Sequence, residues 1–194
     1  MIVYNGLKQD FLHSVEMDTL AREIENNVYQ KLGRRTVANE YASWVNSYEY
    51  MYKVMNDPEI PGDAGIAIEY NIPQTAKQVD FMISGYNADD CPGMVIVELK
   101  QWSKLAKVPD SSALVETYTG NSMRKVVHPS YQAWSYAQLI SDYNAAVQDD
   151  QIRLAPCAYL HNYLRQDGDP IDDAQYDLYT RSAPAFTQGQ VYEA

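Results

Sequence analysis

Three short runs rich in isoleucine and valine constrain the fold of this chain more than any other feature. They span residues 64–72, 77–85 and 93–100, and only the short segments 73–76 and 86–92 separate them. Runs of this kind, bounded by proline, asparagine and aspartate, are typical of β-strands. Because both connections are short, we expect the three strands to form an antiparallel meander within a central mixed sheet.

Helical patterns lie on both sides of this meander. Apolar residues recur at helical spacing in 11–32 and 36–56, and a third helical segment, 129–149, opens with a proline. Residues 101–128 show no regular pattern, whereas 152–160 is an apolar run with strand character. The expected order is therefore α-α-β-β-β-α-β, which predicts an α/β fold.

Length and composition predict one domain, residues 1–165, followed by an acidic tail or linker, residues 166–194. The chain has two cysteines, which excludes a disulfide framework, and no apolar run approaches the length of a membrane span. Together with the absence of a signal-peptide pattern at its start, this predicts a cytoplasmic protein without a membrane partner. The net charge of −11 argues against a protein that coats nucleic acid.

Hairpin arithmetic brings three carboxylates together. Paired residues in an antiparallel hairpin have a constant sum of residue numbers, so a turn centred on residue 89 places Asp80 opposite Glu98. The turn 73–76 likewise places Glu69 opposite Asp80. Cross-strand neighbours have Cβ atoms about 5 Å apart. Without a bulge, all three carboxylates therefore converge, with Lys100 on the same face as Glu98 and the Leu99 side chain on the other.

Three neighbouring carboxylates repel one another unless a cation holds them. Mg²⁺ prefers oxygen ligands and keeps bound water. A nearby lysine can orient or deprotonate such a water, and the metal stabilises charge on a phosphate under attack. The residues therefore predict hydrolysis of a phosphodiester bond with Mg²⁺ or Mn²⁺ as cofactor.

The segments VDFMISG and VIVELK resemble the signature of the PD-(D/E)XK nuclease superfamily. Asp80, Glu98 and Lys100 stand at its signature positions. The resemblance implies a restriction-endonuclease-like core, α-β-β-β-α-β, to which this chain adds an N-terminal helix. It also implies that the backbone carbonyl of Leu99 can ligate the metal. The proline of the signature is absent here, because Gln78 and Val79 precede Asp80.

The segment Gln132-Ala-Trp-Ser-Tyr136 is similar to the QxxxY motif of the RecB-like branch of this superfamily. The resemblance implies that Gln132 and Tyr136 lie beside the metal site and contact nucleic acid. Their spacing, i and i+4, puts both side chains on one face of a helix. The metal-binding glutamate that the family carries on a helix is left open between Glu40 and Glu49.

A wider resemblance comes from VELKQW and HPSYQAWSYA. These segments look like the N-terminal nuclease-like domain of bacterial proteins that continue into a Schlafen-type helicase domain. The similarity covers nearly the whole chain and implies a helicase or ATPase domain or subunit as partner. The sequence contains no GxxxxGK[ST] phosphate-binding loop.

The region between the meander and the third helix is locally basic. Residues 100–128 hold five lysines and arginines against two acidic residues, a balance of 5 − 2 = +3. Phosphate contacts dominate the affinity of proteins for nucleic acid. The candidates for such contacts are Lys104, Lys107, Arg124 and Lys125. Because the whole chain is acidic, we expect it to bind DNA weakly alone and only with divalent metal.

Each candidate also has an ordinary structural explanation. Asp80, Glu98 and Lys100 can be a ladder of surface charges, although directly opposed carboxylates destabilise a sheet. Gln132 and Tyr136 can be a surface glutamine and a core tyrosine, and the basic loop can simply be solvated.

The sequence thus predicts a Mg²⁺- or Mn²⁺-dependent deoxyribonuclease that acts as the nuclease module of a larger DNA-processing or defence system. The alternative is a catalytically inactive module of the same fold that binds nucleic acid or assembles with a helicase. An acidic DNA-mimic inhibitor ranks last, because it leaves the E-x-K and Q-x-x-x-Y motifs unexplained. DNA against RNA, and endonuclease against exonuclease action, remain open at this point.

Overall fold

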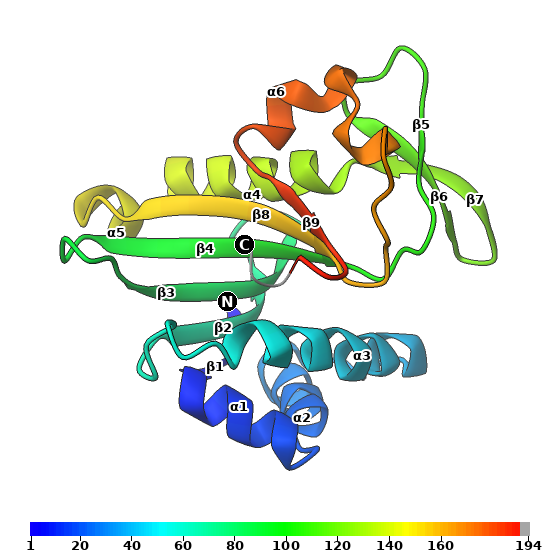
Figure 1. Cartoon of the computed structure of the whole chain (residues 1–194). Coiled ribbons are helices and arrows are strands. Elements are labelled where there is room, and N and C mark those ends of the chain that lie inside the picture. Colours follow the sequence, from blue (N-terminus) through cyan, green and yellow to red (C-terminus); the bar gives the residue numbers. More distant parts are fainter. Residues whose placement is uncertain (191–194) are drawn as a thin grey trace. The chain divides into compact units, whose positions relative to one another are not determined.

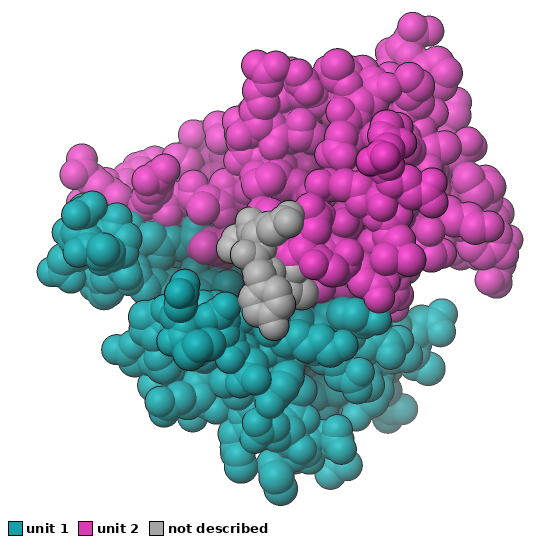
Figure 2. Space-filling model, viewed as in Figure 1, with its two compact units in different colours: residues 1–94 teal, residues 95–194 magenta. Residues whose placement is uncertain are grey.

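Helices and strands are interspersed along the chain, and both antiparallel and parallel strand pairs occur (Figure 1). The structure is a computed structural model and describes residues 1–190. It divides into two compact units, residues 1–94 and 95–194 (Figure 2). The predicted α/β class is therefore confirmed. Within the described part of the chain, no helix is both long enough and apolar enough to cross a membrane.

The first unit combines a three-stranded antiparallel sheet with three helices. The sheet order is β1-β2-β3. The helices contact one another, and α1 and α2 contact the sheet (Figure 1). The elements are β1 (Ile2–Leu7), α1 (Lys8–Glu16), α2 (Leu20–Leu32), α3 (Ala38–Met55), β2 (Gly65–Asn71) and β3 (Gln78–Tyr86). Phe11 of α1 and Phe81 of β3 are fully buried, with ring centroids 5.2 Å apart in an edge-to-face contact.

The pairing of β2 with β3 follows the predicted register. Six pairs, among them Ile68 with Phe81 and Tyr70 with Val79, all have residue numbers that sum to 149. The hydrophobic pattern and the short turn fix this register, because a slip of one residue would turn every side chain to the other face. The prediction for this hairpin is therefore confirmed.

The prediction of one helix over residues 11–32 is wrong. The chain forms α1 and α2 with a break at Met17–Thr19, where Asp18 has a left-handed φ of 55°. The Thr19 hydroxyl donates to the Ser14 carbonyl and to the Glu23 carboxylate. Threonine favours such local hydrogen bonds at helix starts over helix interiors. The strand β1 was also not predicted.

The second unit contains two sheets. One sheet has the order β4-β8-β9, and β5-β6-β7 form the other. Helix α4 packs along β8 (Figure 1). The elements are β4 (Pro92–Lys100), β5 (Ala106–Lys107), β6 (Leu114–Thr119), β7 (Ser122–Val127), α4 (Pro129–Tyr143), α5 (Ala145–Asp149), β8 (Arg153–Leu160), the 3₁₀ helices η1 (Pro170–Asp172) and η2 (Ala174–Tyr176), α6 (Asp177–Thr180) and β9 (Ala185–Thr187).

The prediction of an irregular segment over residues 101–128 is wrong, because this region forms β5, β6 and β7. Gly120 and Asn121 join β6 to β7, and both have positive φ, 56° and 65°. Two central residues with positive φ form the type I′ turn that suits a two-residue hairpin. The dipeptide Gly-Asn was the available signal. The predicted helix 129–149 is also two helices, because the Asn144 side chain caps α5 and accepts from the Val147 amide.

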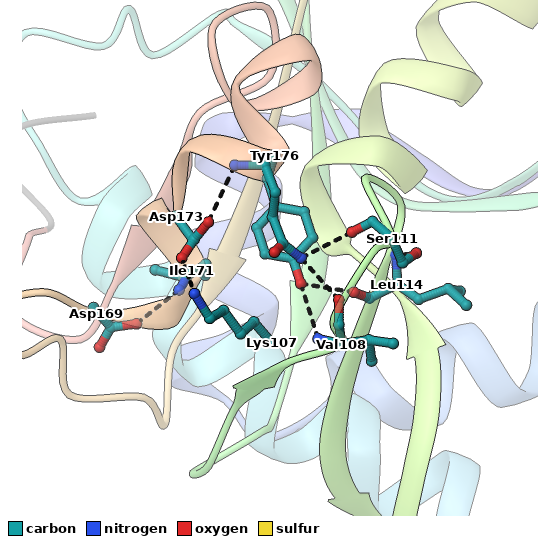
Figure 3. Close-up of polar contacts among 9 residues, drawn as sticks. Lys107, Val108, Ser111, Leu114, Asp169, Ile171, Asp173 and Tyr176 are labelled. Carbon is teal, nitrogen blue, oxygen red and sulfur yellow. Dashed lines mark hydrogen bonds and ion pairs between the residues drawn. The ribbon is translucent and has the colours of Figure 1, made fainter.

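The segment from residue 166 to 190 holds more structure than the predicted acidic tail or linker. Strand β9 pairs in parallel with β8, and η1, η2 and α6 precede it. Despite its acidic composition, it contains the large, fully buried side chains of Ile171 and Tyr176. The Tyr176 hydroxyl donates to the Leu114 carbonyl at 2.7 Å and accepts from the Val108 amide at 3.3 Å (Figure 3).

Candidate functional site

Glu98 and Lys100 form a buried ion pair at the end of β4. The two residues are i and i+2 in a strand, so their side chains leave the same face. Lys100 Nζ lies 2.5 Å from Glu98 Oε1, and the side chains are only 17% and 2% exposed. The Lys100 ammonium also lies 5.5 Å from the centroid of the Trp102 ring, within range of a cation–π contact. The intervening Leu99 is buried.

Helix α4 brings the glutamine and tyrosine of the Q-x-x-x-Y motif to this ion pair. Gln132 Nε2 donates to Glu98 Oε1 at 2.7 Å and to the Tyr136 hydroxyl at 2.8 Å. The amide of Gln132 has two N–H groups, so it can make both bonds at once. The structure therefore connects Glu98, Lys100, Gln132 and Tyr136 in one network. Sequence analysis predicted all four as site residues.

The start of α4 is fixed by a buried histidine. His128 is the N-cap residue, and its Nδ1 accepts from the Ser130 amide at 3.1 Å. Its ring stacks on Tyr176 with centroids 4.4 Å apart, and its own amide donates to the Ala113 carbonyl. Burial lowers the pKa of His128 to about 4, so the ring is neutral at pH 7. His128 thus holds Gln132, one turn later, in position.

In the first unit, Glu69 has an unusual backbone conformation within β2. The pairs on either side of it place Glu69 opposite Asp80, as the hairpin arithmetic predicted. Glu69 itself has φ = 56°, a left-handed value that costs a residue other than glycine about 1–2 kcal/mol. The side chain of Glu69 reaches α3, whose Tyr48 also contacts the Phe81 ring.

The Glu69 carboxylate is buried and held by two aromatic side chains of α3. Trp44 Nε1 donates to its Oε1 at 2.8 Å, and the Tyr48 hydroxyl donates to the same oxygen at 3.3 Å. Burial and the negative charge of Asp80 raise the pKa of Glu69 to about 7, against the Trp44 hydrogen bond, which lowers it. Glu98 belongs to the second unit, and its pairing with Asp80 stays a prediction from the sequence.

The two glutamates of α3 that the sequence left open occupy different settings. Both carboxylate oxygens of Glu40 bind the Arg34 guanidinium, at 2.6 and 2.8 Å, which lowers the Glu40 pKa. The charge of Glu40 nevertheless contributes to the raised pKa of Glu69. Glu49 lines a pocket between the helices of the first unit. Of the two, Glu40 is therefore the residue whose charge reaches the Glu69–Asp80 position.

Carboxylate oxygens are the donors that this chain offers a metal. Across residues 1–190, no group of three or more histidine, cysteine, aspartate or glutamate side chains is arranged to hold a metal ion. Mg²⁺ usually takes only one or two protein carboxylates and completes its shell with water and substrate phosphate. Glu69 and Asp80 are two such carboxylates, and the negative charge of Asp80 contributes to the raised pKa of Glu69. The described residues therefore show no metal site made of protein ligands alone, and Mg²⁺ or Mn²⁺ stays a prediction from the sequence.

The four basic residues predicted to grip nucleic acid lie in or beside the small sheet. Lys104, Arg124 and Lys125 are exposed, and Lys125 lies opposite Glu116 across the β6–β7 pair. Lys107 is already paired with Asp173, with its Nζ 2.7 Å from Oδ2 (Figure 3). This ion pair ties the C-terminal segment to β5. Lys107 is therefore the least suited of the four to hold a phosphate.

Two residues of the Glu69 environment were not predicted as part of a site. Trp44 and Tyr48 appear in the sequence as members of an apolar helix face, and their burial agrees with that. Their polar atoms, however, both donate to Glu69. The signal that was available is chemical: a buried tryptophan or tyrosine needs a partner for its N–H or O–H group.

Comparisons of the chain with protein-family models, with curated proteins and with solved structures found no match. The residues and their geometry therefore carry the functional argument alone.

Proposed function

We propose that this chain is a metal-dependent nuclease that hydrolyses DNA phosphodiester bonds. The observation that carries the proposal is the network that joins Glu98 and Lys100 of β4 to Gln132 and Tyr136 of α4. An E-x-K strand and a Q-x-x-x-Y helix that were found separately in the sequence supply side chains that bind one another. A chance occurrence of either motif would not require this contact.

In this proposal, Asp80 and Glu98, with Glu69, hold Mg²⁺ or Mn²⁺, and the carbonyl of Leu99 adds a further oxygen. The metal would lower the pKa of a bound water and stabilise the charge that develops on the phosphate. The left-handed backbone of Glu69 supports a functional role, because strained conformations of this kind persist mainly where a site requires them. The fold is then a restriction-endonuclease-like core.

The chain's own residues have distinct roles. The Lys100 ammonium would hold and orient the attacking water. Its ion pair with Glu98 fixes the ammonium group, and Gln132 fixes the Glu98 oxygen on the other side. Tyr136 accepts from Gln132 and keeps the amide in this orientation.

In the same proposal the protein is cytoplasmic and acts on DNA. A helicase or ATPase domain or subunit is its protein partner. Lys104, Arg124 and Lys125 would contact phosphates, with Lys107 available only when its ion pair with Asp173 opens. The charge of −11 limits the affinity for DNA, so a partner would supply most of the grip.

The test is a cleavage assay with the purified chain. Single-stranded DNA, linear duplex, closed circular duplex and RNA are each incubated with Mg²⁺ or with Mn²⁺. We expect cleavage of DNA, reduced about a hundredfold or more in Asp80→Asn and in Lys100→Ala. Products from the circular substrate would identify an endonuclease, and RNA products would change the proposed substrate.

Matched controls remove the same charges far from these motifs in sequence. Asp167→Asn and Arg181→Ala alter exposed side chains and should leave cleavage unchanged. Thermal unfolding of every variant separates loss of function from loss of fold. No cleavage of any substrate, or cleavage that both Asp80→Asn and Lys100→Ala leave intact, would refute the nuclease. DNA binding without cleavage would favour the inactive binding module.

A further inference from the structure

The three helices of the first unit enclose a pocket that the nuclease proposal does not use. Its volume is about 590 Å³, within the range of small-molecule sites. Helix α3 supplies one wall, with Tyr41, Trp44, Tyr48 and Tyr52, and α1 and α2 supply the others. Such a pocket is large enough for an extended small molecule rather than a single ion.

Four aromatic side chains line this pocket. Trp44 and Tyr48 are buried, while Tyr41 and Tyr52 are half-buried. The Trp44 N–H and the Tyr48 hydroxyl are both bound to Glu69. The rings themselves are therefore what these two residues present to the pocket. Aromatic faces carry negative partial charge and attract cations.

The mouth of the pocket is acidic. Glu16, Asp18 and Glu49 line it and are exposed, and the Tyr52 hydroxyl donates to Glu16 Oε1 at 2.8 Å. Among the described residues that line the pocket, none is lysine, arginine or histidine. Carboxylates around aromatic walls favour a ligand that is positively charged and also has apolar surface.

We propose that this pocket binds a linear aliphatic polyamine. Such a molecule carries several ammonium groups separated by methylene chains. The ammonium groups match the three carboxylates at the mouth, and the methylene groups match the tyrosine and tryptophan rings. An inorganic cation would leave the aromatic walls without contact, and an anion would face three negative charges.

The test is isothermal titration calorimetry of the full chain with spermidine, at physiological ionic strength and without divalent metal. We expect one spermidine per chain. The double variant Asp18→Asn/Glu49→Gln should bind about tenfold more weakly or worse, and Tyr41→Leu, which keeps the charge, should also weaken binding. Thermal unfolding in the absence of spermidine verifies that the variants are folded.

The matched control is Glu59→Gln/Asp63→Asn, which removes two exposed carboxylates of the same unit that do not line the pocket. It should bind spermidine as the unmodified chain does, and so should Asp80→Asn. Equal weakening by both double variants would show general attraction to an acidic surface and overturn the proposal. No binding of spermidine, or binding that Tyr41→Leu leaves unchanged, would overturn it too.

Discussion

Two buried glutamates of this chain are held in opposite ways. Glu98 in the second unit is bound by a cation, Lys100, and by an amide, Gln132. Glu69 in the first unit is bound by the neutral donors of Trp44 and Tyr48. Their exposures are similar, 2% and 7%. The comparison therefore separates the effect of the partner from the effect of burial.

The difference is that the second unit supplies its own countercharge. A buried carboxylate is costly unless a cation and hydrogen bonds accompany it. Lys100 meets this need for Glu98, whereas Glu69 faces the like charge of Asp80 and its pKa rises to about 7. An external cation bound at Glu69 would play the part that Lys100 plays at Glu98. This is the electrostatic reason to expect that the charged form of Glu69 depends on an added cation more than the charged form of Glu98 does.

The largest expected effect is the loss of Lys100. Lys100→Met leaves Glu98 as a buried charge without its ammonium partner, which typically costs about 3–5 kcal/mol. Urea unfolding at pH 7 measures this change in the free energy of unfolding. Adding Glu98→Gln to the variant removes the stranded charge and should restore most of the stability.

The control for this prediction is Lys107→Met. Its ion pair with Asp173 is more exposed, at 54% and 27% of the two side chains, and such pairs contribute about 1 kcal/mol or less. If Lys100→Met were as stable as Lys107→Met, Lys100 would not be the countercharge on which the buried Glu98 depends.

Removing the charge of Glu69 should stabilise the folded state, whereas the loss of Lys100 destabilises it. Because its pKa is raised from 4.5 to about 7, the folded state binds more protons than the unfolded state between these values. Stability is therefore lost as pH rises through this window, by up to about 3 kcal/mol. Glu69→Gln should raise the free energy of unfolding by about 1–2 kcal/mol at pH 8 and leave it nearly unchanged at pH 5, where Glu69 is already protonated.

Thermal unfolding at the two pH values, in chelator, checks this prediction. Glu25→Gln, which removes a less buried carboxylate of α2, is the control and should show no such pH dependence. If Glu69→Gln changed the free energy of unfolding equally at pH 5 and pH 8, ionisation of Glu69 would not destabilise the folded state.

Around both Glu69 and Glu98, sequence analysis predicted the features that follow from periodicity and residue spacing. The register that opposes Glu69 to Asp80, and the i, i+2 and i, i+4 spacings around Glu98, are local properties of strands and helices. The left-handed φ of Glu69 was not predictable, because neither periodicity nor spacing specifies the φ of a single strand residue. The bonds from Trp44 and Tyr48 depend on the tertiary contact of Glu69 with α3.

The small sheet β5-β6-β7 was missed for a different reason. Its residues are mixed in polarity, and Val115 and Thr117 are fully buried only because the tertiary structure covers them. Alternation in the sequence is therefore weak, and Gly120-Asn121 was the signal for the hairpin turn between β6 and β7. The structure of the C-terminal segment was also missed, because acidic residues surround the buried Ile171 and Tyr176 in the sequence.

The smallest expected effects come from two tyrosines, Tyr136 beside Gln132 and Tyr48 beside Glu69. Tyr136 accepts from Gln132 at 2.8 Å, whereas Tyr48 donates to Glu69 at 3.3 Å, a longer and weaker hydrogen bond. Tyr136→Phe leaves one N–H of Gln132 without this acceptor and should cost about 1 kcal/mol. Tyr48→Phe should cost less, because Trp44 still donates to the same oxygen at 2.8 Å. Chemical denaturation of both variants at pH 7 resolves the order. If Tyr48→Phe were the more damaging change, the neutral donors would hold Glu69 as firmly as Lys100 and Gln132 hold Glu98, and Glu69 would need no external cation.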